Sequence, residues 1–178
     1  MPSVISNSQR GPNPAGRSAK PLRLYSRVLL ACAVVIFLTA SSRLPDSVLQ
    51  ALNDADHYEL LSLDPIPPAT PSPDNFHGFT VLGHVDITDP ATRQKLTQAL
   101  RTSAREAGPP ARCFNPRHGL RGTHSGHDTD LVICFECAQV KVYTGSKEAE
   151  GFGVSQHQQG ILDDVLKKAG VKLAPPIS

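Results

Sequence analysis

The stretch "RCFNPRHGLRGTHSGHDTDLVICFEC", residues 112–137, holds three of the four cysteines and three of the seven histidines of this 178-residue chain. Its second half opens the run "DLVICFECAQVKVY", whose β-branched and apolar residues predict the longest strand of the chain. Another strand is expected to open at "ARCF", and the polar residues 119–129 between the two are expected to form a loop. The stretch therefore predicts a β-hairpin that turns near residue 124 or 125.

The residues outside this hairpin predict two more strands and three helices. The strands are expected at residues 57–63 and 76–87, with an extended loop indicated by five prolines in residues 64–75. The helices are expected at residues 44–56, from a cap at Thr88 or Asp89 to Gly108, and at about 155–169. This order of elements predicts an α+β domain, in which two or three helices pack on one face of a small, largely antiparallel sheet of about four strands.

The first 42 residues differ in composition from the rest of the chain. Residues 1–27 carry five Lys and Arg and no acidic residue, and their Ser, Pro, Gly and Asn content is typical of a disordered tail. The uncharged run "VLLACAVVIFLTA", Val28–Ala40, follows. As an apolar helix this run would reach about 20 Å, short of the roughly 30 Å hydrocarbon core of a bilayer. With its basic flank it is typical of a signal anchor or signal peptide within residues 28–42.

The basic flank also predicts where the rest of the chain lies. The positive-inside rule keeps residues 1–27 in the cytoplasm and places residues 43–178 outside, attached to the cell membrane in a single pass through residues 28–40. Small residues at 40–42 offer a second outcome, in which cleavage near Ser42 releases a secreted domain. In either location the domain can keep disulfides.

The charge balance argues against nucleic-acid binding. The net charge of the chain is +2, but all 16 acidic residues lie beyond residue 27, and only 13 of the 18 Lys and Arg do. The predicted exported domain is therefore mildly acidic and has no basic footprint. We expect no nucleic-acid partner, and the sequence does not identify the protein or ligand partner.

The cysteines of the hairpin support three interpretations, and the sequence alone leaves all three open. In an extended strand, the Cα atoms of Cys134 and Cys137 would be about 10 Å apart, beyond the ~7 Å limit for a disulfide. The hairpin instead places Cys113 opposite residues 135–137, so Cys113–Cys137 is the expected bridge, worth about 3 kcal/mol of stability. In the second interpretation, the cysteines are buried free thiols that pack as small hydrophobes.

The third interpretation is a metal site that holds zinc. Cys113, His118, Cys134 and Cys137 have the side chains that structural zinc sites use. An extended strand would point Cys134 and Cys137 to opposite faces, which argues against one shared ion. A second set of potential ligands lies on the predicted loop and its flanks: His118, His124, His127, Asp128 and Asp130.

Two familiar motifs in the stretch lack the context that their chemistry needs. Arg117-His118-Gly119 matches the signature of histidine phosphatases, but too few residues follow it for the long α/β domain of those enzymes. The CxxC at Cys134 lies within a predicted strand, whereas thioredoxin-like chemistry needs the first cysteine at a helix N-terminus. We predict no catalytic residue. Arg117, His118 and Glu136 remain candidate functional polar residues, and Glu136 either acts as a half-buried acid or base or pairs with a nearby arginine.

The segments "YELLSLDP", "FHGFTVLG", "CFNPRHGL" and "DLVICFEC" together resemble a family of uncharacterised bacterial membrane-anchored or exported proteins with a CFxPRHG…DLVICFxC signature. The resemblance covers about residues 57–173 and implies no established activity. With the composition, it leads us to expect a membrane-anchored or exported domain that is not an enzyme and acts by binding in the cell envelope. The alternative is a zinc-binding protein or small metalloenzyme that uses the Cys/His-rich hairpin.

Overall fold

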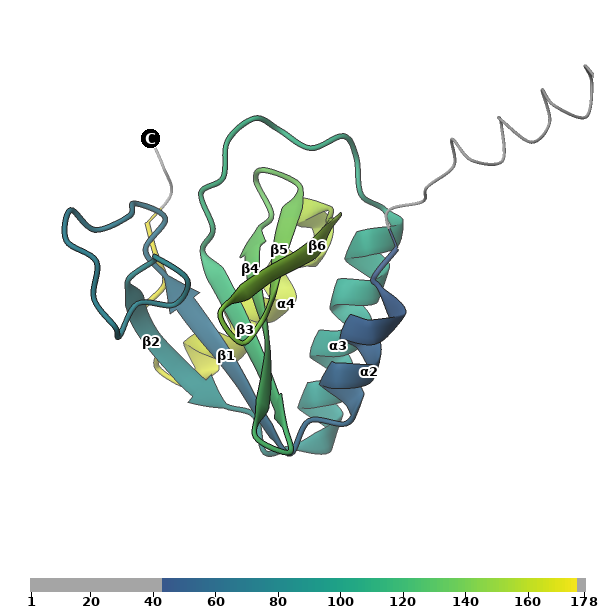
Figure 1. The fold of residues 1–178 in the computed structure, drawn as a ribbon. Coiled ribbons are helices and arrows are strands. Elements are labelled where there is room, and N and C mark those ends of the chain that lie inside the picture. The colour runs from purple at the N-terminus through teal and green to yellow at the C-terminus, as the bar shows by residue number, and fades with distance from the viewer. Residues whose placement is uncertain (1–42, 176–178) are drawn as a thin grey trace, which may run out of the picture. The chain divides into compact units, whose positions relative to one another are not determined.

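The computed structural model describes residues 43–175, which form an α+β unit (Figure 1). Its helices are α2 (Asp46–Asn53), α3 (Pro90–Arg105) and α4 (Gln159–Lys168), the last preceded by a 3-10 helix at Gln156–Gln158. Its strands are β1 (His57–Leu63), β2 (Val81–Asp86), β3 (His118–His124), β4 (His127–Cys134), β5 (Gln139–Thr144) and β6 (Lys147–Gly153). These strands form one sheet in the order β2-β1-β3-β4-β5-β6, and every neighbouring pair is antiparallel.

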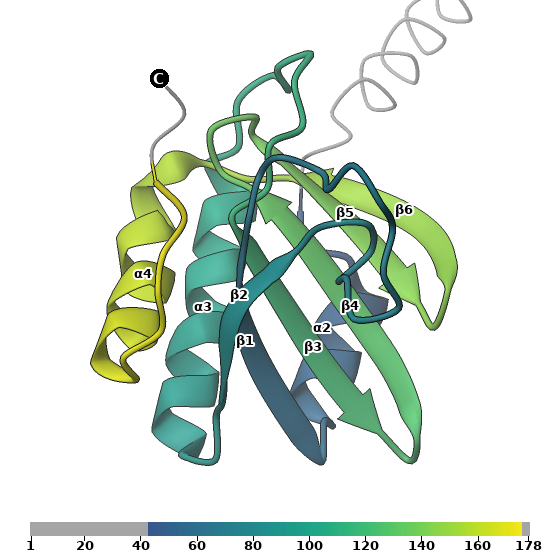
Figure 2. The same ribbon diagram turned by 90° about the vertical axis from the view of Figure 1, so that its left-hand side faces the viewer.

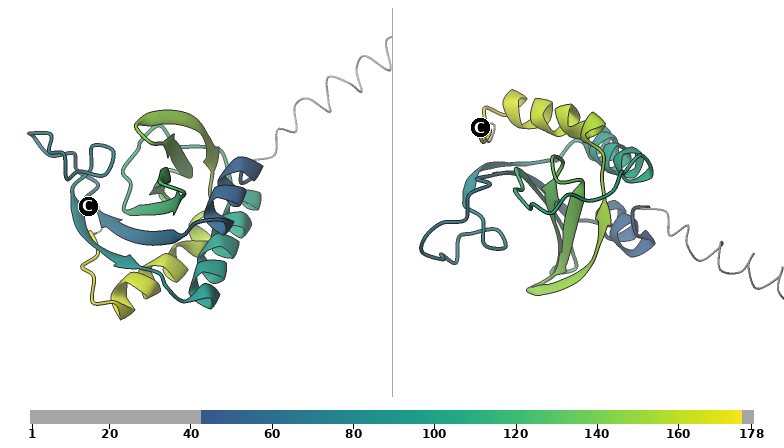
Figure 3. Two further views of the ribbon diagram at one scale, coloured as in Figure 1. Left: turned by 60° about the horizontal axis from the view of Figure 1, so that its bottom comes forward. Right: turned by 90° about the horizontal axis from the view of Figure 1, so that it is seen from above.

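The helices α2, α3 and α4 lie together on one side of the curved sheet, which we call the helix-covered face (Figure 2, Figure 3). Alternate strand residues such as Leu60, Leu120 and Leu131 point to this face and are fully buried. Leu96 of α3 and Leu162 of α4 belong to the same cluster. Because each buried leucine contributes about 1.5–3 kcal/mol, this layer is the main hydrophobic core. The predicted packing of helices on one face of the sheet is confirmed.

The opposite face of the sheet, which we call the helix-free face, is covered by irregular chain. Leu61, Leu63, Phe76 and Val132 form a second, smaller cluster of buried residues there, and Phe114 packs against it. Phe76 belongs to the long loop between β1 and β2, which crosses in front of the sheet in Figure 2. The second cluster therefore holds this loop against the sheet and brings its polar residues onto the helix-free face.

The helix α3 begins and packs as its sequence predicts. The Asp89 side chain accepts hydrogen bonds from the backbone N–H groups of Ala91 and Thr92, and Pro90 occupies the first helical position. Such an N-cap contributes about 1 kcal/mol. Strand β1 covers the same residues, 57–63, that the alternation of the sequence predicts.

The hairpin that joins β3 and β4 turns where the sequence indicates, but its loop is much shorter than expected. His124 pairs with His127, so the turn consists of Ser125 and Gly126 alone. Both turn residues have positive φ, 48° and 78°, which is the conformation of a two-residue type I′ turn. Most of the predicted polar loop at 119–129 therefore lies in the strands, and Arg121, Thr123 and Asp128 share one face of the hairpin.

The expected long strand "DLVICFECAQVKVY" is wrong, because the chain reverses within it. β4 ends at Cys134, residues 135–138 form a turn, and β5 begins at Gln139. Ala138 takes a left-handed conformation with φ of 55° in this turn, although no Gly, Asn or Pro marks it. The strand expected at "ARCF" is also absent, although the N–H of Ala111 still donates to the Cys137 carbonyl at 3.0 Å.

The described part of the chain has six strands instead of the expected four or so. The additional pairing comes from β5 and β6, and β6 was missed because only Phe152 among its seven residues is buried. β2 is shorter than the predicted strand 76–87, because Phe76 and Phe79 bond to each other across a tight turn.

The predicted cytoplasmic tail, residues 1–27, and the predicted apolar helix, residues 28–42, lie outside the described residues. Among residues 43–175, none of the helices combines the length and the apolar character that crossing a membrane would need.

Candidate functional site

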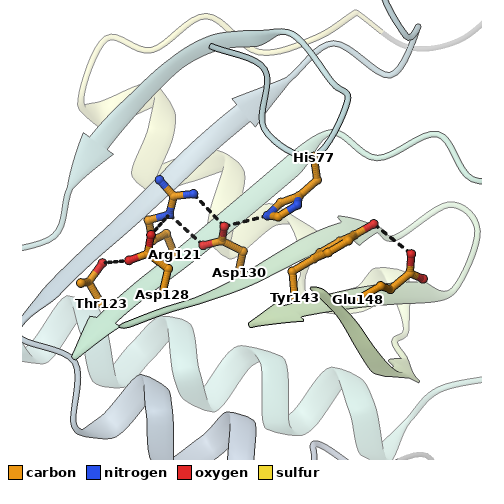
Figure 4. Close-up of polar contacts among 7 residues, drawn as sticks. All are labelled: His77, Arg121, Thr123, Asp128, Asp130, Tyr143 and Glu148. Carbon is orange, nitrogen blue, oxygen red and sulfur yellow. Dashed lines mark hydrogen bonds and ion pairs between the residues drawn. The ribbon is translucent and has the colours of Figure 1, made fainter. Parts of the chain in front are cut away.

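Asp130 is a buried carboxylate on the helix-free face, and two basic side chains hold it (Figure 4). Its side chain is only 2% exposed. Arg121 lies directly opposite on β3 and donates from Nε to Oδ1 at 2.8 Å and from Nη2 to Oδ2 at 2.7 Å. His77 Nε2, from the loop, lies 2.7 Å from Oδ2. One carboxylate is thus fixed by a strand on one side and by a loop on the other.

Burial is the largest single influence on the pKa of Asp130, and burial alone would raise it. The hydrogen bonds and the charges of Arg121 and His77 together outweigh burial, so the pKa of Asp130 lies below its ordinary value. Asp130 is therefore ionised at neutral pH. Its charge orders the Arg121 guanidinium and the His77 ring through charge-assisted hydrogen bonds.

His77 sits in a strained backbone conformation, with φ of 49°. Such a conformation in a non-glycine residue costs on the order of 1–3 kcal/mol and persists only where its surroundings impose it. Here the ring stacks on Tyr143, with centroids 3.8 Å apart, and meets the edge of Phe76 at 4.9 Å. Its Nδ1 has no hydrogen-bond partner among the described residues, and this nitrogen is not fully buried. The ring is therefore fixed while one nitrogen stays available to a ligand.

Gly119 of β3 allows the loop residue Phe76 to pack closely against the sheet. A Cβ at this position would lie 2.8 Å from Cε1 of Phe76 and 3.3 Å from Cβ of Leu61. Only a glycine at this position of β3 therefore leaves room for the Phe76 ring, and the neighbouring His77 then contacts Asp130. The Arg121 guanidinium lies 5.2 Å from the centroid of the same ring, so the aromatic ring contacts the charged network as well.

A groove of about 480 Å³ opens beside this network. Six of its polar lining residues come from the loop, the β3–β4 hairpin and the β5–β6 turn: Ser72, Asn75, His77, Arg121, Asp128 and Ser146. The Asp128 side chain, 36% exposed, accepts a hydrogen bond from Thr123 at 2.6 Å and lies 3.7 Å from Arg121 Nε. The groove thus presents a cation between two carboxylates, with hydroxyl and amide groups around it.

Tyr143 links this network to the edge of the sheet. Its ring stacks on His77, and its hydroxyl donates to Glu148 of β6 at 3.2 Å. In Figure 4 the labelled residues lie in one row from Thr123 on β3 to Glu148 on β6, and His77 reaches this row from the loop. Tyr143 therefore contacts both the His77 ring and the edge strand.

Cys113, Cys134 and Cys137 meet at the β4–β5 turn, but they pair differently from the prediction. The disulfide joins Cys134 to Cys137, and Cys113 is a free, exposed thiol whose Sγ lies 3.1 Å from Cys137 Sγ. The predicted Cys113–Cys137 bridge is therefore wrong, and the reason is the turn between β4 and β5. The turn at 135–138 brings the Cα atoms of Cys134 and Cys137 to 5.2 Å, within bridging range, where an extended strand would hold them apart.

The four predicted zinc ligands do not come together. His118 pairs with Ile133 on the helix-covered face, where its Nε2 lies 2.8 Å from Asp163 of α4. Cys134 follows Ile133 in the strand and so points to the other face. Among the described residues, no group of three or more His, Cys, Asp and Glu side chains is arranged to hold a metal ion.

The second predicted ligand set is dispersed as well. His124 and His127 are exposed beside the two-residue turn, and His124 Nδ1 lies 3.3 Å from Asp56. Asp128 and Asp130 instead face Arg121. The hairpin therefore spreads these groups over its tip and both faces.

The candidate polar residues Arg117 and Glu136 form an ion pair, with Nη1 and Oε1 3.3 Å apart. Arg117 also donates to the backbone carbonyl of Pro175, near the end of the described chain. Glu136 is 38% exposed in the β4–β5 turn, where it makes the pair with a nearby arginine that the second alternative describes. The Asp163 carboxylate that receives His118 has a lowered pKa, because this hydrogen bond outweighs the effect of burial.

The sequence interpretation missed His77 and the Arg121–Asp130 pair. The pair had a usable signal: with the turn fixed at Ser125-Gly126, residues 121 and 130 fall opposite each other. His77 had no comparable signal, because it lies 53 positions from Asp130 and reaches it through the fold of a proline-rich loop.

Comparisons of the chain with protein-family models, with curated proteins and with solved structures give no match.

Proposed function

We propose that this chain is a membrane-anchored or exported domain, not an enzyme, that binds an uncharged, hydroxyl-rich ligand of the cell envelope in the groove on the helix-free face. One observation carries the proposal: the buried Asp130 carboxylate orients Arg121 and His77 before any ligand arrives. Preorganised polar groups beside a groove lose little conformational freedom on binding, which favours affinity for small polar ligands.

The charges of the groove favour an uncharged ligand. The Arg121 guanidinium is already neutralised by Asp130 at 2.7 Å and faces Asp128 at 3.7 Å. An anion would meet the repulsion of both carboxylates, and a cation would compete with a guanidinium that is held by two hydrogen bonds. A neutral polar ligand avoids both costs.

The unused hydrogen-bonding groups suit vicinal hydroxyls. Arg121 Nη1 and His77 Nδ1 have no hydrogen-bond partners among the described residues, and the exposed side of Asp128 can accept further bonds. Ser72 and Ser146 add hydroxyl groups at the rim. Planar donors and acceptors close together bind two neighbouring hydroxyl groups at once, so we assign the ligand to the neutral glycans of the envelope.

The location in the envelope is supported by the sequence. The basic residues 1–27, the apolar run at 28–40 and the resemblance to exported bacterial proteins all favour residues 43–178 lying outside the cytoplasm. Protease added to spheroplasts is expected to degrade residues 43–178 and to leave the N-terminal tail protected. Full protection of the domain until the cells are lysed would contradict this location.

The binding test uses the full chain in detergent and isothermal titration calorimetry with neutral oligosaccharides, chito- and cello-oligomers, beside sulfated oligosaccharides of the same length. We expect binding of a neutral glycan that weakens at least tenfold in Asp128→Asn and in Asp130→Asn. Asp164→Asn, the same change at an exposed position on α4, serves as the matched control and should bind like the unmodified chain. Preference for the sulfated ligand, unchanged binding in both groove variants, or no heat with any neutral oligomer would contradict the proposal.

A further inference from the structure

Three sulfur atoms lie in contact at the β4–β5 turn, and only one of them is accessible. Cys134 and Cys137, which form the disulfide, are 1% and 0% exposed. Cys113 is an exposed free thiol, and its Sγ lies 3.1 Å from Cys137 Sγ. A solvent-exposed thiol therefore sits directly against a disulfide that solvent does not reach.

This contact is held by a dense set of hydrogen bonds. The N–H of Ala111 donates to the Cys137 carbonyl at 3.0 Å, and the Gln139 side-chain amide donates to the carbonyls of Ala111 at 2.5 Å and of Cys113 at 3.2 Å. The N–H of Asn115 donates to Cys137 Sγ at 3.2 Å. The chain on both sides of Cys113 is thus fastened to the turn that carries the disulfide.

We propose that these three cysteines form a thiol–disulfide relay, in which the exposed Cys113 thiol exchanges with the buried Cys134–Cys137 disulfide. The Cys113 thiolate attacks Cys137 Sγ, the Cys113–Cys137 bond forms, and the Cys134–Cys137 bond breaks with its electron pair leaving on Cys134. The proton lost from Cys113 is balanced by the one taken up at Cys134. The N–H of Cys137, 3.1 Å from Cys134 Sγ, faces the sulfur on which the negative charge develops.

The exchange places one sulfur of the new disulfide at the surface, where an external dithiol can reach it. A substrate thiolate attacks Cys113, and Cys137 leaves as a thiolate. The second substrate thiol then attacks the substrate sulfur and releases Cys113. The substrate dithiol has become a disulfide, and the two electrons and two protons reside on Cys134 and Cys137. The substrate class is therefore a dithiol, and each chain oxidises one dithiol once.

The relay is independent of the glycan groove, because it rests on different residues. The first test maps the bonds in the full chain carrying Cys32→Ser, alkylated at low pH and cut with trypsin. The resting chain should give an alkylated peptide 113–117 and a peptide 122–141 with an internal disulfide. In Cys134→Ser the same two peptides should be joined through Cys113 and Cys137; two free thiols in that oxidised variant would overturn the relay.

The second test measures the rate at which dithiothreitol reduces the native chain, followed by the same mapping. Cys113→Ser is expected to slow reduction at least tenfold, because the remaining disulfide is buried. Serine changes one sulfur to oxygen at an exposed position, and urea unfolding of this variant verifies that its fold persists. Rates within twofold of each other would overturn the relay. Stoichiometric zinc that the reduced chain retains, and that each single cysteine variant loses, would overturn it as well, since the sulfurs would then be a metal site.

Discussion

The substitution Asp130→Asn tests whether the buried network organises the helix-free face. It keeps the shape of the side chain but removes the charge that receives two hydrogen bonds from Arg121 and one from His77, at 2.7–2.8 Å. Removing one partner of a fully buried ion pair costs about 3–5 kcal/mol. Arg121 is 33% exposed and can regain water, so we expect a loss of about 2–3 kcal/mol in the free energy of unfolding.

Urea unfolding of the full chain in detergent, followed by circular dichroism, measures this loss. The matched control is Asp128→Asn, which removes a carboxylate that is 36% exposed and 3.7 Å from Arg121; its cost should stay below about 1 kcal/mol. The lowered pKa of Asp130 determines how its contribution to stability changes with pH. Its stabilisation is fully present above about pH 3.9, the ordinary Asp value, and is lost as the pH falls through the lower folded-state pKa. Equal losses in the two variants at neutral pH would show that the buried Asp130 carboxylate does not organise this network.

Three further predictions concern other parts of the fold. Gly119→Ala, which drives a Cβ into an aromatic ring, should cost about 1–3 kcal/mol in urea unfolding, whereas Gly108→Ala, with no atom within 4 Å, should cost almost nothing. Equal losses in the free energy of unfolding would contradict the close packing of Phe76 on Gly119. Burial raises the pKa of Tyr58 to about 12, so its contribution to stability is present below about pH 10 and declines as the pH rises toward 12; a tyrosine absorbance titration that finds every tyrosine ionising near pH 10 would be inconsistent with this. Asp163→Asn removes the carboxylate whose pKa the hydrogen bond from His118 lowers, so the variant should lose less stability than the unmodified chain between about pH 4 and pH 2. An unchanged acid limb would argue against this pair.

Elements with local signals could be predicted from the sequence. β1 alternates apolar and polar residues within one strand, and α3 carries its own cap at Asp89 and its own apolar stripe. Both therefore appear where the sequence places them. β6 carries almost no apolar signal, because it is an edge strand that needs only Phe152 to pack.

The turn at residues 135–138 explains most of the errors around the cysteines. The prediction that Cys113 lies beside Cys137 was right, because it depended only on the register of the hairpin. The pairing was wrong because Ala138 adopts a left-handed conformation that its residue type does not announce. A turn without Gly, Asn or Pro is stabilised by its tertiary surroundings, here the disulfide and the segment that carries Cys113.

The candidate site depends on contacts that no local pattern encodes. Asp130 and Arg121 could be paired from the hairpin register, but His77 reaches them only because Phe76 is seated on Gly119. The contact between Phe76 and Gly119 depends on how a proline-rich loop returns to the sheet, which is a property of the packed domain.

A nitrogen-15 NMR titration of the full chain in detergent with a neutral chito-oligomer tests whether the proposed ligand binds in the groove beside Asp130. We predict shifts confined to the groove, strongest for the side-chain signals of His77 and Arg121, and absent in Asp130→Asn. Shifts centred on the helix-covered face, or saturating ligand that leaves the His77 and Arg121 signals unmoved, would rule out the groove as the ligand site.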